Sequence, residues 1–486
     1  MITIEYNDEA FEYDAYALCR SFYPGEETEQ RFMGEDAGCD SIRIFSDMEK
    51  RFVKLVIKAG EVLDHDFERE LSCPDADERE FKWKWKLFFY DCMSEYTGRT
   101  LPWGALTGVR PIKLIGGIMN EQGREGLEDF LNDEYRVSRK KAELGIRISK
   151  NESALLKPYE YKGHSLYIGI PFCPSRCLYC SFLSYDYGKM KKHVAEYLEC
   201  VEKELKAYVE IMGEKPSTVY IGGGTPTALN AAELDELLSM AEEYADAANT
   251  DEFTVEAGRP DSLDDEKFRV MKAHGVSRIS VNPQTFKEDT LELIGRKHSV
   301  ADVEKAFVAA REAGFDNINM DLILGLPGEN AEDVRRTLDR AAELNPDSLT
   351  VHSLALKRSS KMTQWIAEHG AISGMDHDAA MEYALKTAES LKMEPYYLYR
   401  QKNIAGALEN TGFAAEGKYG IYNILIMEEV QSIYAIGAGT VSKRVNQGDG
   451  SAVEITRCDT HKDLSLYLSD IQAMIERKRR LFGATD

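Results

Sequence analysis

The middle of the chain repeats one pattern six times: a short β-rich run, then a segment whose apolar residues keep helical spacing. The six runs are residues 165–170, 217–223, 252–257, 277–283, 317–325 and 348–354. Gly275 and Gly314 stand where two helical segments end, as helix-terminating glycines do. Six such units in series predict a parallel sheet that curls into an open barrel. The nearly continuous apolar runs SLYIGI and DLILG agree, because parallel sheets bury both faces.

The segments on either side lack this rhythm, so we expect three parts in the 486 residues: an α+β domain (1–158), the βα core (159–394) and a C-terminal region that covers the substrate (395–486). In the first part, ITIEY, SIRIF and RFVKLVIKA predict strands, and Phe81, Trp85, Phe88 and Cys92 predict a helix. SKNESALLKP (149–158) is predicted to be a linker. In the last part, YYLYRQKN, IYNILIM and SIYAIGAG predict added strands and a glycine turn.

The charge balance restricts the class of partner. The chain has 60 Lys and Arg against 84 Asp and Glu, a formal net charge of −24. Nucleic-acid binding and adsorption to anionic membranes both depend on Lys and Arg, so we expect neither partner. No run approaches 18 apolar residues, and the acidic start MITIEYNDEAFEYDAY has no signal-peptide pattern. We therefore expect a cytoplasmic protein.

Three of the nine cysteines form a cluster of their own: Cys173, Cys177 and Cys180, in the spacing Cys-x3-Cys-x2-Cys. Three thiolates this close together can converge on one soft metal centre. Structural zinc normally takes four ligands, and no fourth Cys or His follows at zinc-finger spacing. The pattern favours a [4Fe–4S] cluster with three cysteine ligands and one iron open to an outside molecule.

The remaining polar motifs follow successive predicted strands. The cysteines follow the first, Gly222-Gly223-Gly224-Thr225-Pro226 the second and Gln284 the fourth, while Glu256 ends the third and Asp321 lies within the fifth. The carboxyl ends of barrel strands form the active face, so these groups point to one mouth. Alternatively, the glycines form an ordinary turn, and Glu256 and Gln284 are satisfied polar residues. Asp321 needs a partner inside its apolar strand, such as a ribose hydroxyl pair or an arginine.

The cysteine motif, with Tyr179 as its aromatic residue, resembles the signature of the radical S-adenosylmethionine (SAM) superfamily. The resemblance implies a partial (β/α)6 barrel whose open iron binds the amino and carboxylate groups of SAM. It also implies that an injected electron cleaves SAM to methionine and a 5′-deoxyadenosyl radical, which removes a hydrogen atom from the substrate. GGGTP resembles the glycine motif of this superfamily, where bare backbone approaches the SAM amino group.

Longer blocks narrow the resemblance. The chain is similar to the oxygen-independent coproporphyrinogen III oxidase family in GIPFCPSRCLYCSF, IGGGTPT, VNPQTF, MDLILGLPGE and LNPDSLTVHSLALKR. It resembles the HemZ-type coproporphyrinogen dehydrogenases in LTGVRPIKL, RQKN and YNILIMEE…AIGAG. Members convert the propionates on rings A and B to vinyl groups, giving protoporphyrinogen IX, and pass one electron to an acceptor. The resemblance implies a second SAM beside the first.

Matched position by position, the family's contacts fall on named residues. Those to the cluster-bound SAM match Tyr167, Gly223, Glu256 and Val441. Those to the second SAM match Tyr179, Gly224, Thr225, Gln284, Arg296, Asp321 and Ala355. Two positions depart from the oxidases: Gly169 replaces a histidine, and Phe182 replaces a fourth cysteine. Haem-chaperone relatives share both departures, so a cluster-containing haem-binding chaperone is the alternative. A tRNA-modifying radical SAM enzyme is a third possibility, which the charge of −24 opposes.

A tetrapyrrole with four propionates needs local cations on an acidic protein. The candidates are Lys357, Arg358, Arg400 and Lys402. A second basic group flanks the cysteines and could receive an acidic electron donor such as flavodoxin or ferredoxin: Arg176, Lys189, Lys191 and Lys192. Ordinary solvated helix ends would explain both groups as well.

Overall fold

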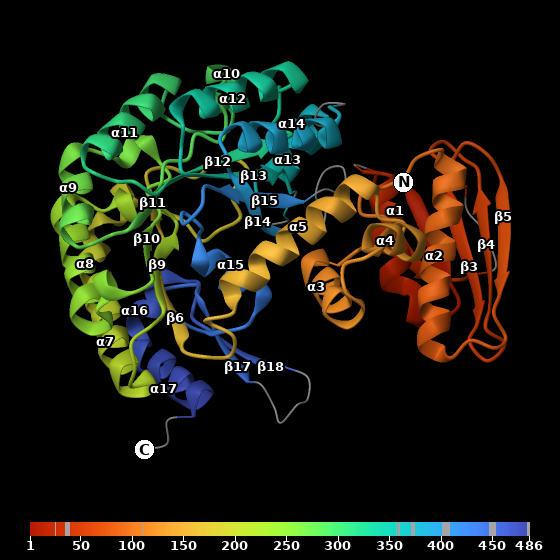
Figure 1. Cartoon of the computed structure of the whole chain (residues 1–486), viewed down its shortest axis with the longest axis horizontal. Helices are drawn as coiled ribbons and strands as arrows, with labels where there is room; N and C mark the ends of the chain where they lie inside the picture. The colour runs from red at the N-terminus through yellow and green to blue at the C-terminus, as the bar shows by residue number, and fades with distance from the viewer. Residues whose placement is uncertain are drawn as a thin grey trace. The chain divides into compact units, whose positions relative to one another are not determined.

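The computed structural model describes residues 1–24, 26–34, 39–108, 110–355, 357, 360–370, 375–400, 409–446 and 453–483. The chain forms two compact units (Figure 1). The first holds Met1–Ile146 and Arg400–Glu409, and the second holds Arg147–Tyr399 and Asn410–Asp486. The three-part division at residues 158 and 394 stays a prediction about functional parts.

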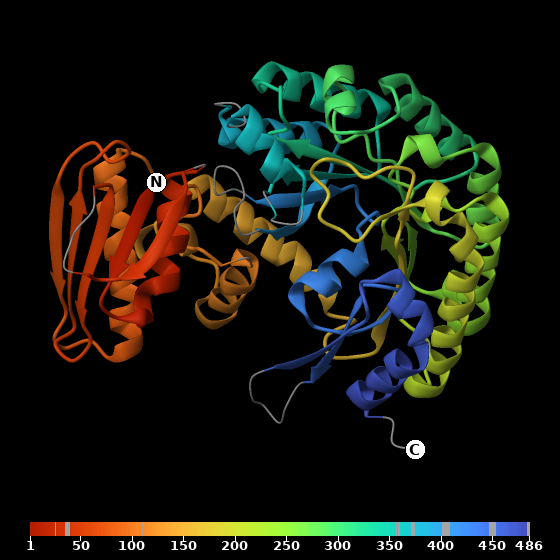
Figure 2. The ribbon, with the colours of Figure 1, turned by 180° about the vertical axis from the view of Figure 1, so that it is seen from behind.

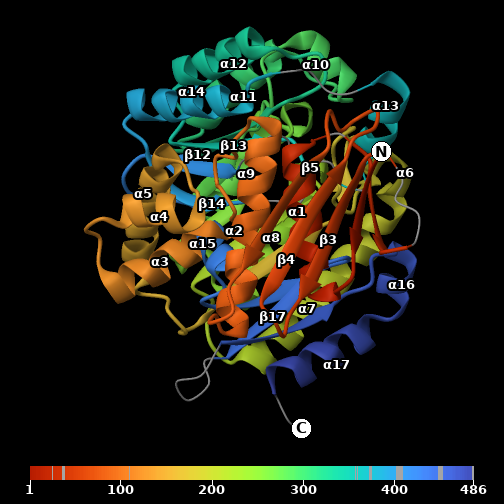
Figure 3. The same ribbon diagram turned by 90° about the vertical axis from the view of Figure 1, so that its right-hand side faces the viewer.

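The first unit is an α+β structure with a five-stranded sheet in the order β2-β1-β3-β4-β5. Its strands, seen side by side in Figure 3, are β1 (Ile2–Tyr6), β2 (Thr28–Phe32), β3 (Ser41–Asp47), β4 (Phe52–Lys58) and β5 (Phe67–Ser72). Helices α1 (Glu12–Phe22) and α2 (Glu78–Thr97) cover one face (Figure 1). The predicted strands and the aromatic helix are confirmed: Phe81 and Trp85 of α2 are buried, and Trp85 stacks on Phe11. Helices α3 (Pro111–Gln122) and α4 (Leu127–Tyr135) follow.

The predicted linker at 149–158 is wrong, because helix α5 runs unbroken over Arg139–Leu156. Ile148, Glu152 and Leu156 recur every four residues along this helix, and all three are buried. Because Glu152 at the middle position is charged, these positions do not form a continuous apolar stripe in the sequence. Lys, Glu, Ala and Leu are nevertheless good helix formers, so the local propensity agrees with the structure.

The second unit contains the predicted parallel sheet, with strand order β13-β12-β11-β10-β9-β6 inside an eleven-stranded sheet. The strands are β6 (His164–Ile170), β9 (Thr218–Gly223), β10 (Glu252–Val255), β11 (Arg278–Ser280), β12 (Ile318–Leu324) and β13 (Ser348–Ser353). Each neighbouring pair in this series is parallel. The α/β fold class with a partial (β/α)6 barrel is therefore confirmed.

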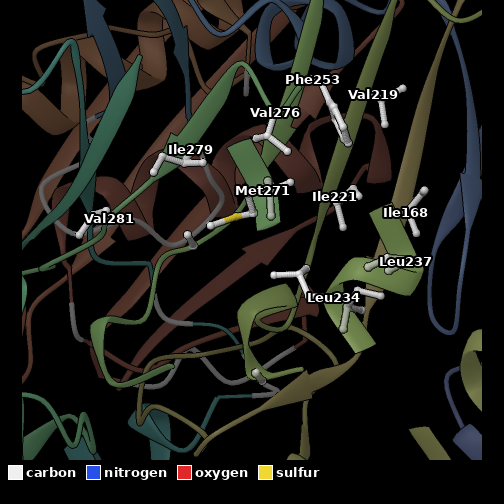
Figure 4. Packing of buried hydrophobic residues seen from close by; sticks show 14 of the residues in the cluster. Ile168, Val219, Ile221, Leu234, Leu237, Phe253, Met271, Val276, Ile279 and Val281 are labelled. Carbon is white, nitrogen blue, oxygen red and sulfur yellow. The ribbon is translucent and has the colours of Figure 1, made fainter. Parts of the chain in front are cut away.

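Helices cover the outer face of this curved sheet (Figures 1 and 2). They are α7 (Val194–Met212), α8 (Ala231–Ala245), α9 (Asp265–Ala273), α11 (Val300–Glu312), α12 (Ala331–Leu344) and α14 (His377–Ser390). Figure 4 shows Ile168 and Ile221 of the strands packed with Leu234 and Leu237 of α8, all fully buried. Gly275 and Gly314 have φ angles of +72° and +88°, which confirms them as helix-terminating glycines.

The C-terminal segment extends both edges of the sheet. Strands β14 (Glu394–Tyr399) and β15 (Asn410–Ala414) add to the β13 edge. Strands β16 (Ser432–Ile436), β17 (Val441–Asn446) and β18 (Glu454–Asp459) add to the β6 edge, followed by α16 (Leu464–Ser469) and α17 (Ile471–Phe482). In the described part of the chain, no helix is long and apolar enough to cross a membrane.

The strand predicted for IYNILIM is wrong, because these residues form helix α15 (Ile421–Glu428). Periodicity alone does not separate a short apolar strand from a buried helix. The decisive group is Glu252 of β10, whose carboxylate accepts hydrogen bonds from the backbone N–H groups of Ile421 (2.6 Å) and Tyr422 (3.4 Å). A buried carboxylate at a helix N-terminus satisfies free donors and complements the helix dipole.

Candidate functional site

The loop that carries the cysteines is fixed by segments far away in the sequence. It leaves the two-residue strand β7 (Phe172–Cys173), which pairs with β8 (Tyr185–Asp186). The Leu178 N–H donates to the Ile294 carbonyl (2.9 Å), and the Leu178 carbonyl accepts from the Met362 N–H (3.0 Å). The Ser175 hydroxyl donates to the Gly295 carbonyl at 3.1 Å. These bonds tie the loop to α10 (Glu288–Leu293) and α13 (Met362–His369), so its shape is set by the barrel.

The three thiols lie in a shielded environment. Cys173 and Cys177 are buried and Cys180 is partly exposed. Burial raises the pKa of the Cys173 thiol to about 11 and also raises the pKa of Cys180. The Thr225 hydroxyl lies 3.4 Å from the Cys173 sulfur. Thiols in this state become thiolates when a metal centre supplies positive charge.

The donor set of the loop suits an iron–sulfur cluster. Three cysteine thiolates within eight residues are soft ligands that can hold three irons of a [4Fe–4S] cluster and leave the fourth iron open. Structural zinc normally takes four ligands. Across the described ranges, no group of three His, Cys, Asp or Glu side chains is arranged to hold a single metal ion.

The glycine motif packs directly against the cysteine loop. A Cβ atom on Gly224 would lie 2.7 Å from the Phe172 carbonyl oxygen and 2.9 Å from the Cys173 sulfur. Gly223 has a φ of +108°, and a Cβ on Gly222 would lie 2.9 Å from the Glu256 carboxyl carbon. A side chain is thus disfavoured at Gly224 by the cysteine loop, at Gly223 by backbone strain, and at Gly222 by the side chains of Tyr220 and Glu256. Bare backbone is left facing this corner of the barrel.

Glu256 directly follows β10 and connects this corner to a stack of tyrosines. The Tyr220 hydroxyl donates to its carboxylate at 2.6 Å, and burial raises the pKa of Glu256 to about 7. Tyr167 stacks with Tyr220 and with Tyr422, each at 6.1 Å between ring centroids, and Tyr220 stacks with Tyr422 at 4.5 Å. Sequence reasoning missed Tyr220 and Tyr422. The alternation in STVYIGG, which places Tyr220 beside Tyr167 in register, was an available signal for the first.

Arg296 is hydrogen-bonded to Tyr179, which lies within the cysteine loop. The Arg296 guanidinium donates to the Tyr179 hydroxyl (3.1 Å) and to the carbonyls of Gly258 (3.1 Å) and Asn282 (2.6 Å). Its Nε atom is buried with no hydrogen-bond partner in the structure. A buried donor of this kind suits a carboxylate ligand.

Asp321 has partners other than those expected. Its carboxylate accepts from the amides of Asn282 and Asn319, each at 2.7 Å, and lies 3.9 Å from His352. Burial alone would raise its pKa, but His352, Asn319 and Arg278 together lower it. The Gln284 N–H donates to the Asp321 carbonyl at 3.0 Å, with Gln284 at a φ of +67°. A non-glycine residue held there is strained, as residues at functional sites often are.

The two remaining predicted residues are Ala355 and Val441. Ala355 lies two residues beyond β13, and Val441 begins β17 two residues after the turn at Gly437–Gly439. The hydrogen bonds of the described residues do not connect either of them to the groups above. The contacts assigned to SAM therefore remain predictions for all eleven residues.

Similarity to known proteins agrees with this geometry. A model of the radical SAM superfamily matches residues 167–341. The oxygen-independent coproporphyrinogen-III oxidase-like protein HemZ of Bacillus subtilis (strain 168) is 39% identical over 405 residues, which cover 81% of this chain and 80% of HemZ. The chain belongs to the HemZ-like family of radical SAM proteins. Members of the superfamily use a [4Fe–4S] cluster and SAM, as the cysteine motif predicts.

Other relatives of this radical SAM protein match a smaller part. The heme chaperone HemW of Bacillus subtilis (strain 168) is 40% identical over 195 residues, which cover 40% of this chain and 51% of HemW. The structure titled coproporphyrinogen III oxidase (HemN) from Escherichia coli superposes with a TM-score of 0.52 at 21% identity, covering 67% of this chain and 73% of that chain. The HemN similarity supports the fold.

Proposed function

We propose that this protein is a cytoplasmic, oxygen-independent coproporphyrinogen III dehydrogenase that converts two propionates to vinyl groups and yields protoporphyrinogen IX. The similarity to HemZ carries the proposal, because it extends over 81% of the chain, whereas the HemW similarity covers 40%. For each propionate, one hydrogen atom leaves its β-carbon, the carboxylate departs as carbon dioxide, and one electron goes to an external acceptor. The cluster and SAM together supply the chemistry that removes the hydrogen atom.

We assign the site residues as follows. Cys173, Cys177 and Cys180 bind the cluster. The first SAM would contact Tyr167, Gly223, Glu256 and Val441, with the carboxylate of Glu256 suited to its ammonium group. A second SAM would contact Tyr179, Gly224, Thr225, Gln284, Arg296, Asp321 and Ala355. The unpartnered Nε of Arg296 and the low-pKa carboxylate of Asp321 suit its carboxylate and its ribose hydroxyls.

Lys357 is the propionate contact that the structure supports best. Its ammonium group lies 5.7 Å from the ring centroid of Phe182, and Phe182 is 65% exposed beside the cysteine loop. A cation and an exposed aromatic ring suit a tetrapyrrole that carries carboxylates. Arg400 is buried in the first unit, where it donates to the Leu106 carbonyl. Arg358 and Lys402 lie outside the described residues.

An acidic electron donor such as flavodoxin or ferredoxin would dock on the basic side chains next to the cysteine loop. Lys189 of α6 (Tyr187–Met190) is exposed, as are Lys191 and Lys192, which follow it. The Arg176 side chain lies in the loop itself and reaches the Cys180 carbonyl at 3.5 Å. Complementary charge would guide the donor to the part of the surface nearest the cluster.

A haem-binding chaperone is the second candidate, favoured by the observation at Gly169. A Cβ atom there would lie 2.6 Å from Thr440 Cγ2 and 3.3 Å from the Tyr167 ring. The histidine that the oxidases carry at this position would therefore require the Thr440 side chain to move. The oxidase activity would then have to proceed without this histidine.

One anaerobic incubation separates the two functions. The reconstituted protein receives SAM, dithionite, an electron acceptor and coproporphyrinogen III, and chromatography measures porphyrins and 5′-deoxyadenosine. The dehydrogenase predicts harderoporphyrin or protoporphyrin together with substrate-dependent 5′-deoxyadenosine, and neither product from a variant with all three cluster cysteines changed to alanine. Deoxyadenosine without a porphyrin product, combined with a Soret band on adding haem, would replace the proposal with the chaperone.

A further inference from the structure

Arg259 contacts the cysteine loop, although the sequence motifs do not include it. It lies four residues beyond the end of β10, and its side chain is 5% exposed. The guanidinium donates to the Cys177 sulfur (3.3 Å), the Ser175 carbonyl (3.1 Å) and the Ser175 hydroxyl (2.9 Å). A single buried cation thus holds the backbone of the loop and touches one of its three predicted cluster sulfurs.

Asp261 fixes the orientation of this guanidinium. Two parallel hydrogen bonds join the Arg259 Nε and Nη2 atoms to the Asp261 carboxylate oxygens at 2.9 Å and 2.7 Å. The Asp261 side chain is 14% exposed, and Nδ1 of the fully buried His298 lies 3.7 Å from its Oδ1 atom. Because a bidentate pair restricts rotation of the arginine fork, Nη1 is kept pointing at Cys177.

A donor and a positive charge at a ligand sulfur have a defined electrostatic effect. Reduction adds one negative charge to an iron–sulfur cluster, and hydrogen bonds to its sulfurs and nearby cations stabilise that added charge. Arg259 should therefore raise the reduction potential. The carboxylate of Asp261 lies farther from the sulfur and acts in the opposite direction, so the pair sets an intermediate value. A neutral donor could hold the loop by bonding to the Ser175 carbonyl. The charge of the Arg259–Asp261 pair therefore points to an electrostatic role in addition to holding the loop.

We propose that Arg259 is a positioning residue that orients Cys177 and raises the reduction potential of the cluster, and that Asp261 orients Arg259 and limits this rise. The proposal rests on the cluster and not on the choice between dehydrogenase and chaperone, since both would contain one. Arg259 and Asp261 would thus control how readily the cluster accepts the electron that starts the reaction.

The test is an anaerobic redox titration of the reconstituted full chain, followed by electron paramagnetic resonance, with iron content measured in parallel. Arg259→Gln should shift the one-electron equilibrium about tenfold toward the oxidised cluster, which equals about 59 mV to lower potential. Asp261→Asn should shift it in the opposite direction. Arg259→Lys, which keeps the charge but not the fork, should fall between Arg259→Gln and the wild type.

The matched control is Arg311→Gln, which removes an arginine–aspartate pair (2.5 Å) between α11 and Asp347, the residue before β13. Its cluster should titrate like the wild type. Shifts of the same sign in Arg259→Gln and Asp261→Asn, or none in either variant at full iron content, would overturn the proposal, because a purely structural tether predicts lost iron and no sign reversal. If Arg259→Gln assembles no cluster, the signs of Arg259→Lys and Asp261→Asn decide the question.

Discussion

Glu256→Gln should make the protein more stable while weakening its binding of SAM. Burial raises the pKa of this carboxyl from 4.5 to about 7, so at high pH the fold holds a charge that the unfolded chain accommodates more easily. One pKa unit corresponds to about 1.4 kcal/mol, and the penalty is about 3 kcal/mol at pH 8. In the wild type the Tyr220 hydroxyl donates to the Glu256 carboxylate at 2.6 Å. The glutamine amide oxygen can accept the same hydrogen bond, but it carries no charge.

The sign of the pH dependence follows from the direction of this pKa. The folded-state carboxyl has the higher pKa, so the penalty is complete above about pH 7 and disappears as the pH falls to about 4.5. At pH 5.5 only about 1.4 kcal/mol remains. At roughly 2 °C per kcal/mol for a domain of this size, Glu256→Gln should raise the Tm of the apoprotein by about 6 °C at pH 8 and about 3 °C at pH 5.5.

The assay is thermal unfolding of apoprotein at both pH values, with SAM affinity of the reconstituted protein measured by calorimetry. Loss of a charged hydrogen bond should weaken SAM binding roughly 10- to 100-fold. Glu329→Gln is the matched control: burial also raises the pKa of Glu329 to about 7, so its variant should gain stability in the same way and bind SAM normally. A Glu256→Gln protein that is less stable than the wild type at pH 8, or whose gain does not depend on pH, would refute the electrostatic reasoning.

Other substitutions test the contacts around the cluster loop. Gly224→Ala should cost about 1–3 kcal/mol in urea unfolding and lower the iron content, because its methyl group meets the Cys173 sulfur at 2.9 Å; unchanged iron would contradict this. Gly117→Ala, whose methyl group meets nothing within 4 Å in a helix, should instead stabilise by about 0.5–1 kcal/mol. Gly169→His should lower the Tm and produce no more porphyrin than the wild type, and a gain in product would show that Thr440 moves aside. Removing any one ligand sulfur should abolish 5′-deoxyadenosine formation and the cluster absorbance, whereas Cys19→Ser, at a buried cysteine of the first unit, should keep both.

The sequence predicts the parts of the site that lie at strand ends, but not the contacts between segments that are far apart in the chain. The cysteine loop, the glycine motif and Glu256 each lie at or just beyond the carboxyl end of one strand, so the strand order places them near one another. Arg259 and Asp261 follow the same strand as Glu256, but no local sequence pattern predicts a role for them. Their role depends on the contact of Arg259 with a loop more than 80 residues earlier. Tyr422 joins Tyr167 from still farther along the chain.

The sequence by itself determined the six βα units, the parallel order of their strands, the cysteine motif and the family. These follow from side-chain periods and spacings within short segments, where steric and hydrogen-bond preferences act locally. Only the tertiary structure decided that IYNILIM is a helix, because Glu252 binds its first N–H groups from 169 residues earlier. It also decided that α5 continues to Leu156 and that Asp321 pairs with Asn282 and Asn319. Buried polar groups must find partners wherever the fold brings them, and that choice depends on contacts that no local pattern records.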